Sequence, residues 1–422
     1  MLYLESFAQR VQLAEIVSRW LVNRPSGGDV ARLKAIVNFN TYIANLWVDW
    51  FTEDLLRRLH GATPARFVAG TKGVIKDFIV EHCPVQTPRV EDLIARYRRF
   101  PEDFYRETPF GGRIYFAEDG GAARFLASTR IKRFRRVAEK GARRIIDFMF
   151  AHIRESADAL AEERARAAGV PRAALITPPD LMIEEFRHAE RRVLKAIRRG
   201  TIQSELPIMA VPDVVGVKVI AEPGGTDAVL DALRAAPGVT ILEEEHHHGV
   251  YNAVNVRMAI PLPRERLRDH PPSGGAVHAF TQRGFTSRDL TGRYLEFLDG
   301  ADDHVLLEVI ISTYDNLLES EIGACMHEER VLAQRENPDY RGHLATNVRY
   351  LMDYMLALCL APSNEDLGEV PIKLWVKYMP DYADALLRRL VCEQADLSFV
   401  ALSAEPHEAA SGPDRAVVET RV

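Results

Sequence analysis

The chain has 422 residues, of which 47% are hydrophobic and 27% charged, and its formal net charge is -6. This composition is typical of a globular protein with two or three packed units, and no apolar run reaches the roughly 18 to 20 residues that span a bilayer, so no membrane partner is expected. The first residues lack a basic segment followed by an apolar one, and the four cysteines form no CxxC pair. We therefore expect a cytoplasmic protein with reduced thiols.

The first 125 residues are expected to form a helical N-terminal region. Apolar residues recur at helical spacing from Leu33 to Phe51, and one short strand-like piece, residues 113–116, lies between two glycine pairs. From Thr129 the pattern predicts a long helix that runs through Ala- and Arg-rich sequence. After a proline-containing loop, a second amphipathic helix is predicted from Leu181 to Arg199.

Beyond Pro212 the sequence changes to short runs rich in β-branched residues. Strands are predicted over 214–220, 239–242, 250–260 and 305–312, with a helix over 227–235. The fold class that follows is α+β, a mixed β-sheet with covering helices, flanked by N-terminal and C-terminal helical regions. Residues 261–303 are expected to form an insertion or a mobile loop that crosses the site.

Two carboxylates in the predicted sheet are candidates for metal binding. Asp213 precedes an apolar strand in which Gly216 allows close approach of a ligand to the backbone, and Glu308 interrupts the apolar run from Val305 to Ile311. A carboxylate inside such a strand is costly to bury unless it is paired or bound to a metal. Magnesium bound with a nucleotide takes one or two protein carboxylates in addition to phosphate oxygens. The alternatives are a solvent-facing Glu308 and an Asp213 that serves a turn.

A run of basic residues between 130 and 144 contains only one acid, Glu139. If a loop enters a helix here, Arg136 and Lys140 lie on one helical face, and Arg130 and Lys132 lie near the N-terminal end. Helix N-termini and guanidinium groups both suit phosphates, so the run is a candidate site for a polyphosphate. The alternative is an ordinary solvated helix face.

The segment from Gly249 to Asn255 is a candidate for base recognition. Alternation along a strand places Tyr251 and Asn255 on one face, where the ring can stack on a base and the amide can hydrogen-bond to it. The preceding His246, His247 and His248 alternate in direction, so at most His246 and His248 converge, which is too few for a transition-metal site without a third ligand. A phosphate contact is the better interpretation of His248.

These segments together resemble the synthetase domain of the RelA/SpoT-type alarmone synthetases. That family has the pattern Arg-x-Lys-x-x-x-Ser-x-x-x-Lys, then Asp-x-x-Gly/Ala-x-Arg, then Gly-Tyr-x-x-x-His, then Glu-x-Gln-x-Arg-Thr. The matching positions here are Arg130, Lys132, Arg136 and Lys140, then Asp213, Gly216 and Lys218, then Tyr251 and Asn255, and finally Glu308, Ile310, Ser312 and Thr313. The resemblance covers roughly residues 125 to 335.

The resemblance implies a nucleotidyltransferase-like fold and a magnesium-dependent transfer of pyrophosphate from ATP to the 3′-hydroxyl of a guanosine nucleotide. It implies that Asp213 binds Mg²⁺ and that Glu308 shares the metal or activates the hydroxyl. It also implies that the basic residues of the first two motifs contact ATP and that residues between 248 and 255 contact the acceptor. The ATP set is Arg130, Lys132, Arg136, Lys140 and Lys218, and the acceptor set is Tyr251, Asn255 and His248.

Several positions depart from the family pattern. The Ser of the first motif is Arg136, the Arg of the second is Lys218, and the His of the third is Asn255. Residues 126–335 are expected to form the synthetase-like domain, with an added helical insertion at about 141–207. They are expected to be followed by C-terminal helices over 336–395 and a disordered tail over 396–422. Two alternative functions remain: a toxin-like pyrophosphokinase that acts on the 3′ end of tRNA, and a non-catalytic nucleotide-binding protein.

Overall fold

The computed structural model describes residues 2–119, 122–201, 209–249, 252–323, 329, 332–333 and 342–390. Its elements follow in the order β1 (Leu2–Leu4), α1 (Arg10–Leu21), α2 (Asp29–His60), β2 (Ala65–Thr71), α3 (Lys72–Glu81), α4 (Pro88–Arg99), η1 (Pro101–Phe104), β3 (Pro109–Asp119), β4 (Ala122–Ile131), α5 (Phe134–Ala167), η2 (Arg172–Ala174), α6 (Pro179–Arg199), β5 (Met209–Val211), β6 (Val215–Ile220), α7 (Thr226–Arg234), β7 (Thr240–His247), β8 (Ala253–Pro261), α8 (Arg264–Arg268), α9 (Gly275–Gln282), α10 (Leu290–Asp299), β9 (His304–Ser312), α11 (Tyr314–Ile322), α13 (His343–Leu360) and α14 (Pro380–Leu390). The tail over 396–422, for which disorder is expected, lies outside the described residues.

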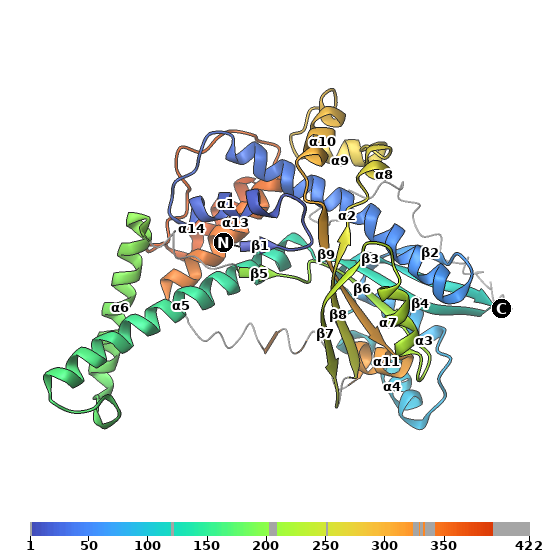
Figure 1. The fold of residues 1–422 in the computed structure, drawn as a ribbon, viewed down its shortest axis with the longest axis horizontal. Coiled ribbons are helices and arrows are strands. Elements are labelled where there is room, and N and C mark those ends of the chain that lie inside the picture. The colour runs from blue at the N-terminus through green and yellow to red at the C-terminus, as the bar shows by residue number, and fades with distance from the viewer. Residues whose placement is uncertain are drawn as a thin grey trace, which may run out of the picture.

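A seven-stranded sheet is the centre of the fold, with the strand order β2-β3-β4-β6-β9-β8-β7. All neighbouring strands are antiparallel except β6 and β9, which are parallel. Strands β2 and β7 are therefore the two edges of this sheet. A separate parallel pair joins β1 to β5. The expected α+β class, with a mixed sheet between helices, is confirmed (Figure 1).

The expectation that residues 1–125 are a helical region is wrong. Strands β2 and β3 and the first residues of β4 lie in this part of the chain and supply one side of the sheet. The glycine pair at 111–112 is not a turn but part of β3. A Cβ atom on Gly112 would lie 1.9 Å from the carbonyl oxygen of Thr129, so the close approach of β4 requires glycine at this position.

Residues 261–303 are also not a mobile loop, because they fold into the helices α8, α9 and α10. The ring of Phe39 in α2 lies 5.1 Å from that of Phe280 and 5.4 Å from that of Phe297, measured between centroids. Phe280, Tyr294 and Leu298 are fully buried. The apolar positions therefore form part of the main core, although the Pro- and Gly-rich stretch at 271–275 suggested a loop.

The two faces of the sheet pack against different helices. On one face Tyr115 and Leu126 join a large core with α2, whereas on the other Ile114 and Phe125 join a smaller core with α3, α4 and α11. Adjacent residues in a strand point to opposite faces, so this alternation fixes the strand register. One face is thus closed by α2, and the other is covered at one end by α11.

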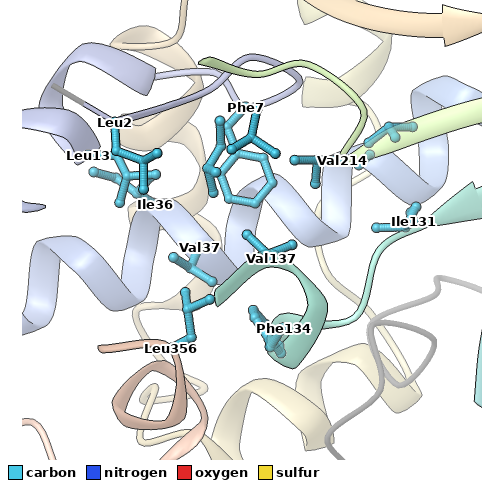
Figure 2. Close-up of a cluster of buried hydrophobic side chains, with 14 of the residues drawn as sticks. Leu2, Phe7, Leu13, Ile36, Val37, Ile131, Phe134, Val137, Val214 and Leu356 are labelled. Carbon is cyan, nitrogen blue, oxygen red and sulfur yellow. The ribbon is translucent and has the colours of Figure 1, made fainter. Parts of the chain in front are cut away.

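Segments that are far apart in the sequence meet beside the start of β6. Figure 2 shows Leu2 and Phe7 from the N-terminus, Val37 from α2, Val137 from α5 and Val214 in one apolar cluster. All five side chains are buried. This packing fixes the chain immediately next to Asp213 and the first turns of α5.

The 34-residue helix α5 begins in this cluster and continues outward, where α6 packs along it. These two helices occupy most of the stretch in which an added helical insertion is expected. In Figure 1 the distal half of α5 and the helix α6 extend away from the sheet. In the described part of the chain, no helix combines the length and the apolar character that a membrane crossing requires.

Candidate functional site

Three neighbouring strands align Arg130, Gly216 and Glu308 in one cross-strand row. Arg130 of β4 faces Gly216 of β6, and Gly216 faces Glu308 of β9. Residues in such a row project their side chains from the same face of the sheet. A Cβ atom on Gly216 would lie 3.7 Å from Oε2 of Glu308, so this carboxylate lies over the glycine. Arg130 Nη2 is 4.0 Å from the same oxygen.

A second cluster forms where β4 ends and β6 begins. The backbone N–H of Lys132 donates to the carbonyl oxygen of Val214 at 2.8 Å, which holds the two chain segments together. The Nζ atom of Lys132 lies 2.7 Å from Oδ2 of Asp213, and Lys140, from the second turn of α5, pairs with the same oxygen. The structure therefore brings together three of the predicted site residues, Lys132, Lys140 and Asp213.

The charges in this cluster shift one another's protonation equilibria. Burial disfavours the ionised form of Asp213, but the ammonium groups of Lys132 and Lys140 outweigh burial and hold the pKa of this carboxyl well below its usual range. Burial lowers the pKa of Lys132 to about 7, and the nearby charge of Arg130 adds to this effect. At neutral pH the aspartate is thus ionised, whereas the lysine is close to its titration midpoint.

One oxygen of Asp213 accepts no hydrogen bond within the described part of the chain. Whereas Oδ2 accepts from the lysines, Oδ1 is buried and has no hydrogen-bond partner there. Within the described residues no group of three or more His, Cys, Asp and Glu is arranged to hold a metal. A Mg²⁺ ion here would depend on Asp213 and Glu308 together with phosphate oxygens. These oxygen ligands suit magnesium, and the two residues lie on or beside neighbouring strands.

The sequence interpretation named Lys218 as an ATP contact but missed Glu321, the acid that pairs with this lysine on the same face. Lys218 lies two residues beyond Gly216 and faces the end of α11, where its Nζ is 3.6 Å from Glu321 and 3.3 Å from Ser320 Oγ. Glu321 also pairs with Lys72 at 2.8 Å. Although burial opposes ionisation, these lysines keep the pKa of Glu321 below its ordinary value. Glu321 occupies an apolar position of its helix, seven residues after the buried Tyr314, and this spacing is the signal that could have revealed it.

The residues predicted to bind the acceptor do not gather around Asp213. Asn255 of β8 shares a cross-strand row with Lys218 and Ile310, and its Oδ1 atom is buried without a hydrogen-bond partner. His248 follows β7, at the level of the C-terminal ends of β6 and β9. From the strand rise of about 3.3 Å per residue, it lies roughly 20 Å or more from Asp213. Tyr251 lies outside the described residues.

The predicted ATP contact Arg136 and the histidines that include the predicted acceptor contact His248 have local partners. Arg136 pairs with Glu139 at 2.8 Å in the first turns of α5, so it is not joined to the Asp213 cluster. His246 lies 2.8 Å from Glu244, and its ring stacks on that of His248 with centroids 6.3 Å apart. His246 and His248 therefore form an exposed stack at the end of the edge strand β7.

A cavity of about 280 Å³ lies elsewhere, between α2, α7 and the start of α8. Its walls include Trp47, Trp50 and Arg266, and the Arg266 guanidinium lies 3.9 Å from the centre of the Trp50 ring. None of the predicted site residues lines this cavity. The charged face of the sheet, which carries Arg130, Lys218 and Glu308, is therefore separate from this cavity.

Comparison of the chain with protein-family models, with curated proteins and with solved structures finds no match.

Proposed function

We propose that the charged face of the sheet binds a magnesium nucleoside triphosphate and transfers pyrophosphate from ATP to the 3′-hydroxyl of a guanosine nucleotide. The observation that supports this proposal is the combination of an ionised Asp213, with one unpartnered oxygen, and Glu308 on the adjacent parallel strand. Three cations, Arg130, Lys132 and Lys140, surround these acids. A nucleotidyltransferase-like fold is part of the same proposal.

In this proposal the cations hold the triphosphate, Glu308 serves as the general base, and both acids would hold the magnesium ion. The acceptor hydroxyl attacks the β-phosphorus of ATP, the bond to the oxygen that bridges the α- and β-phosphates breaks, and AMP leaves. Glu308 takes the proton of the hydroxyl, because its carboxylate is only partly enclosed and lies over the backbone of Gly216. A bound magnesium ion would neutralise phosphate charge between Asp213 and Glu308.

Arg130, Lys132 and Lys140 have complementary roles in this arrangement. Arg130 offers a planar fork that suits two phosphate oxygens at once, whereas each lysine acts as a point charge. Both lysines already contact Asp213, so binding requires the triphosphate to share them with this acid. The lysines thereby position the carboxylate even before the nucleotide binds.

Asn255 is the residue that would contact the acceptor base. The unpartnered Oδ1 of Asn255 can accept a hydrogen bond from a base N–H group, and this atom lies on the charged face. The 3′ end of tRNA is the alternative acceptor, and binding without transfer is the alternative to catalysis.

The test is incubation of the purified protein with ATP, Mg²⁺ and GDP, GTP or bulk tRNA, followed by ion-exchange chromatography. Formation of AMP in equal amount to a pyrophosphorylated acceptor supports the proposal and identifies the acceptor. ATP binding without AMP formation for any acceptor indicates a non-catalytic nucleotide-binding protein. Absence of ATP binding by calorimetry overturns the proposed site altogether.

A further inference from the structure

Helix α6 carries a face that no other described element covers. Its apolar residues Ala189, Val193 and Ile197 are buried, because this side of the helix packs on α5. The opposite side is exposed along its length, and Figure 1 shows that the α5–α6 pair extends away from the sheet. The exposed side is therefore accessible to a large partner.

From residue 187 to residue 199 every exposed charged side chain of this helix is basic or histidine. The exposed cations, which we call the α6 basic face, are Arg187, Arg191, Arg192, Lys195, Arg198 and Arg199. Their spacing of three and four residues places them along one side of the helix. None of them forms a salt bridge with another described residue, so their charges are not neutralised within this part of the chain.

Two acids of α6 have partners on other helices of the protein. Glu185 is half-buried and pairs with Arg164 of α5 at 3.1 Å. Glu190, the only acid between residues 187 and 199, is 3.8 Å from His343 of α13. These two acids therefore serve the contacts of α6 with other helices, whereas Asp180 and Glu184 are exposed near the start of the helix, before the α6 basic face.

We propose that the α6 basic face binds the phosphate backbone of a nucleic acid duplex. The face spans about 17 Å, from the rise of 1.5 Å per residue between Arg187 and Arg198. A duplex carries about one negative charge per 1.7 Å of its axis, so roughly ten phosphates lie within this span. Arg24 extends the face, because its guanidinium donates to the carbonyl oxygen of Arg199 at 3.1 Å and its side chain is exposed.

The same observations disfavour a membrane or a protein partner. A helix that lies in a membrane interface needs a free apolar face, and most apolar residues of α6 face α5. The exposed Met182 and Ile183 precede the basic face by about one turn. A stable protein interface contains an apolar centre, which is absent among the exposed residues from 187 to 199. This inference does not rest on the proposed pyrophosphate transfer.

The test measures the binding of the full chain to fluorescent duplexes of about 20 base pairs, one RNA and one DNA of equivalent sequence, by anisotropy across a range of salt concentrations. The variant Arg187→Gln, Arg191→Gln, Lys195→Gln removes three charges from the face. We expect it to weaken duplex binding at least about tenfold and to lower the slope of log K against log salt concentration by about two to three. Circular dichroism confirms that the variant folds.

The matched control removes the same number of charges from an exposed part of α4, through Arg96→Gln, Arg98→Gln and Arg99→Gln. We expect this control to bind both duplexes as the unchanged protein does. A preference for RNA or for DNA identifies the source of the phosphates, and either preference supports the proposal. Equal weakening by both variants overturns it, because net charge would then explain binding. Binding to vesicles that contain anionic lipid, without binding to either duplex, also overturns it.

Discussion

The Nζ atom of Lys132 and Oδ2 of Asp213 lie 2.7 Å apart, with only 7% and 16% of the two side chains exposed. Each group stabilises the ionised form of the other. Removal of the aspartate would therefore leave the ammonium groups of Lys132 and Lys140 without this carboxylate. Substitution of Asp213 therefore tests folding and chemistry at the same time. Glu308, which is 4.0 Å from Arg130 and less enclosed, is the cleaner probe of the proposed reaction.

Glu308→Gln should abolish pyrophosphate transfer with little effect on stability. The substitution keeps the shape of the side chain but removes the base, so the rate should fall at least about a hundredfold. The matched control is Glu243→Gln, which changes the same residue type in the same cross-strand row, at the exposed edge strand. Rates of AMP formation and thermal melting of both variants provide the measurement. Full activity of Glu308→Gln would remove this residue from the mechanism.

Binding of ATP near pH 8 should be accompanied by proton uptake. The pKa of Lys132 is lowered to about 7, so at pH 8 most of this amine is neutral, and a bound triphosphate should raise the pKa again. Affinity should consequently fall as the pH rises from 7 to 9. Calorimetry in buffers with different ionisation enthalpies measures the number of protons taken up.

The variant Lys132→Met should bind ATP without this proton uptake. Arg136→Gln is the control, because Arg136 pairs with Glu139 and is not joined to the cluster. Proton uptake that persists unchanged in Lys132→Met would assign the titration to another group.

Glu321→Gln should destabilise the fold by about 3 to 5 kcal/mol, because it removes the charge of a buried carboxylate that pairs with both Lys218 and Lys72. Glu319→Gln, two residues earlier, removes a surface pair with Arg89 and should cost less than about 1 kcal/mol. Urea unfolding measures both values. Similar costs for the two variants would contradict the burial of Glu321.

The lowered pKa of Glu321 also predicts a dependence of stability on pH. A carboxyl whose folded pKa lies below its unfolded value contributes stability above about pH 4.3, and this contribution is lost as the pH falls further. Between pH 5 and pH 3 the unchanged protein should therefore lose more stability than Glu321→Gln does.

Substitution by alanine should change the stability of the fold by different amounts at two glycines of the sheet. Gly112→Ala places a methyl group 1.9 Å from a backbone oxygen of β4, so it should cost at least about 3 kcal/mol. Gly216→Ala makes ordinary contacts at 3.5 and 3.7 Å, and stability should change by less than about 1 kcal/mol. Its methyl group would nevertheless lie against the Glu308 carboxylate, and we expect weaker ATP binding by calorimetry.

The strands β6 and β9 and the long helix α5 could be predicted because their apolar patterns are local. The proximity of Asp213 to Lys132 and Lys140 was implied by the family resemblance, whereas the direct ion pairs are visible only in the structure. The pairing of Glu321 with Lys72 joins residues that are 249 positions apart, so no local pattern indicates it.

The errors in the predicted fold have physical causes. Residues 113–116 of β3 have strand character in the sequence, but the pairing of β3 with β2 joins segments that α3 and α4 separate, so no local pattern places them in the sheet. Helices α8 to α10 follow prolines and glycines, which indicate turns when tertiary contacts are unknown. These helices are held in place by the buried Phe280 and Tyr294, which complete the core around Phe39.

Among the described residues, strand β7 has no neighbouring strand on one side, which leaves one row of its backbone N–H and C=O groups without a partner strand. A bare edge of this kind can pair with another chain and so promote aggregation. Here the edge carries Glu243, Glu244 and Glu245, followed by two histidines. A second copy that approached in register would bring like charges together, so the same strand that completes the sheet also discourages edge-to-edge association between molecules at neutral pH.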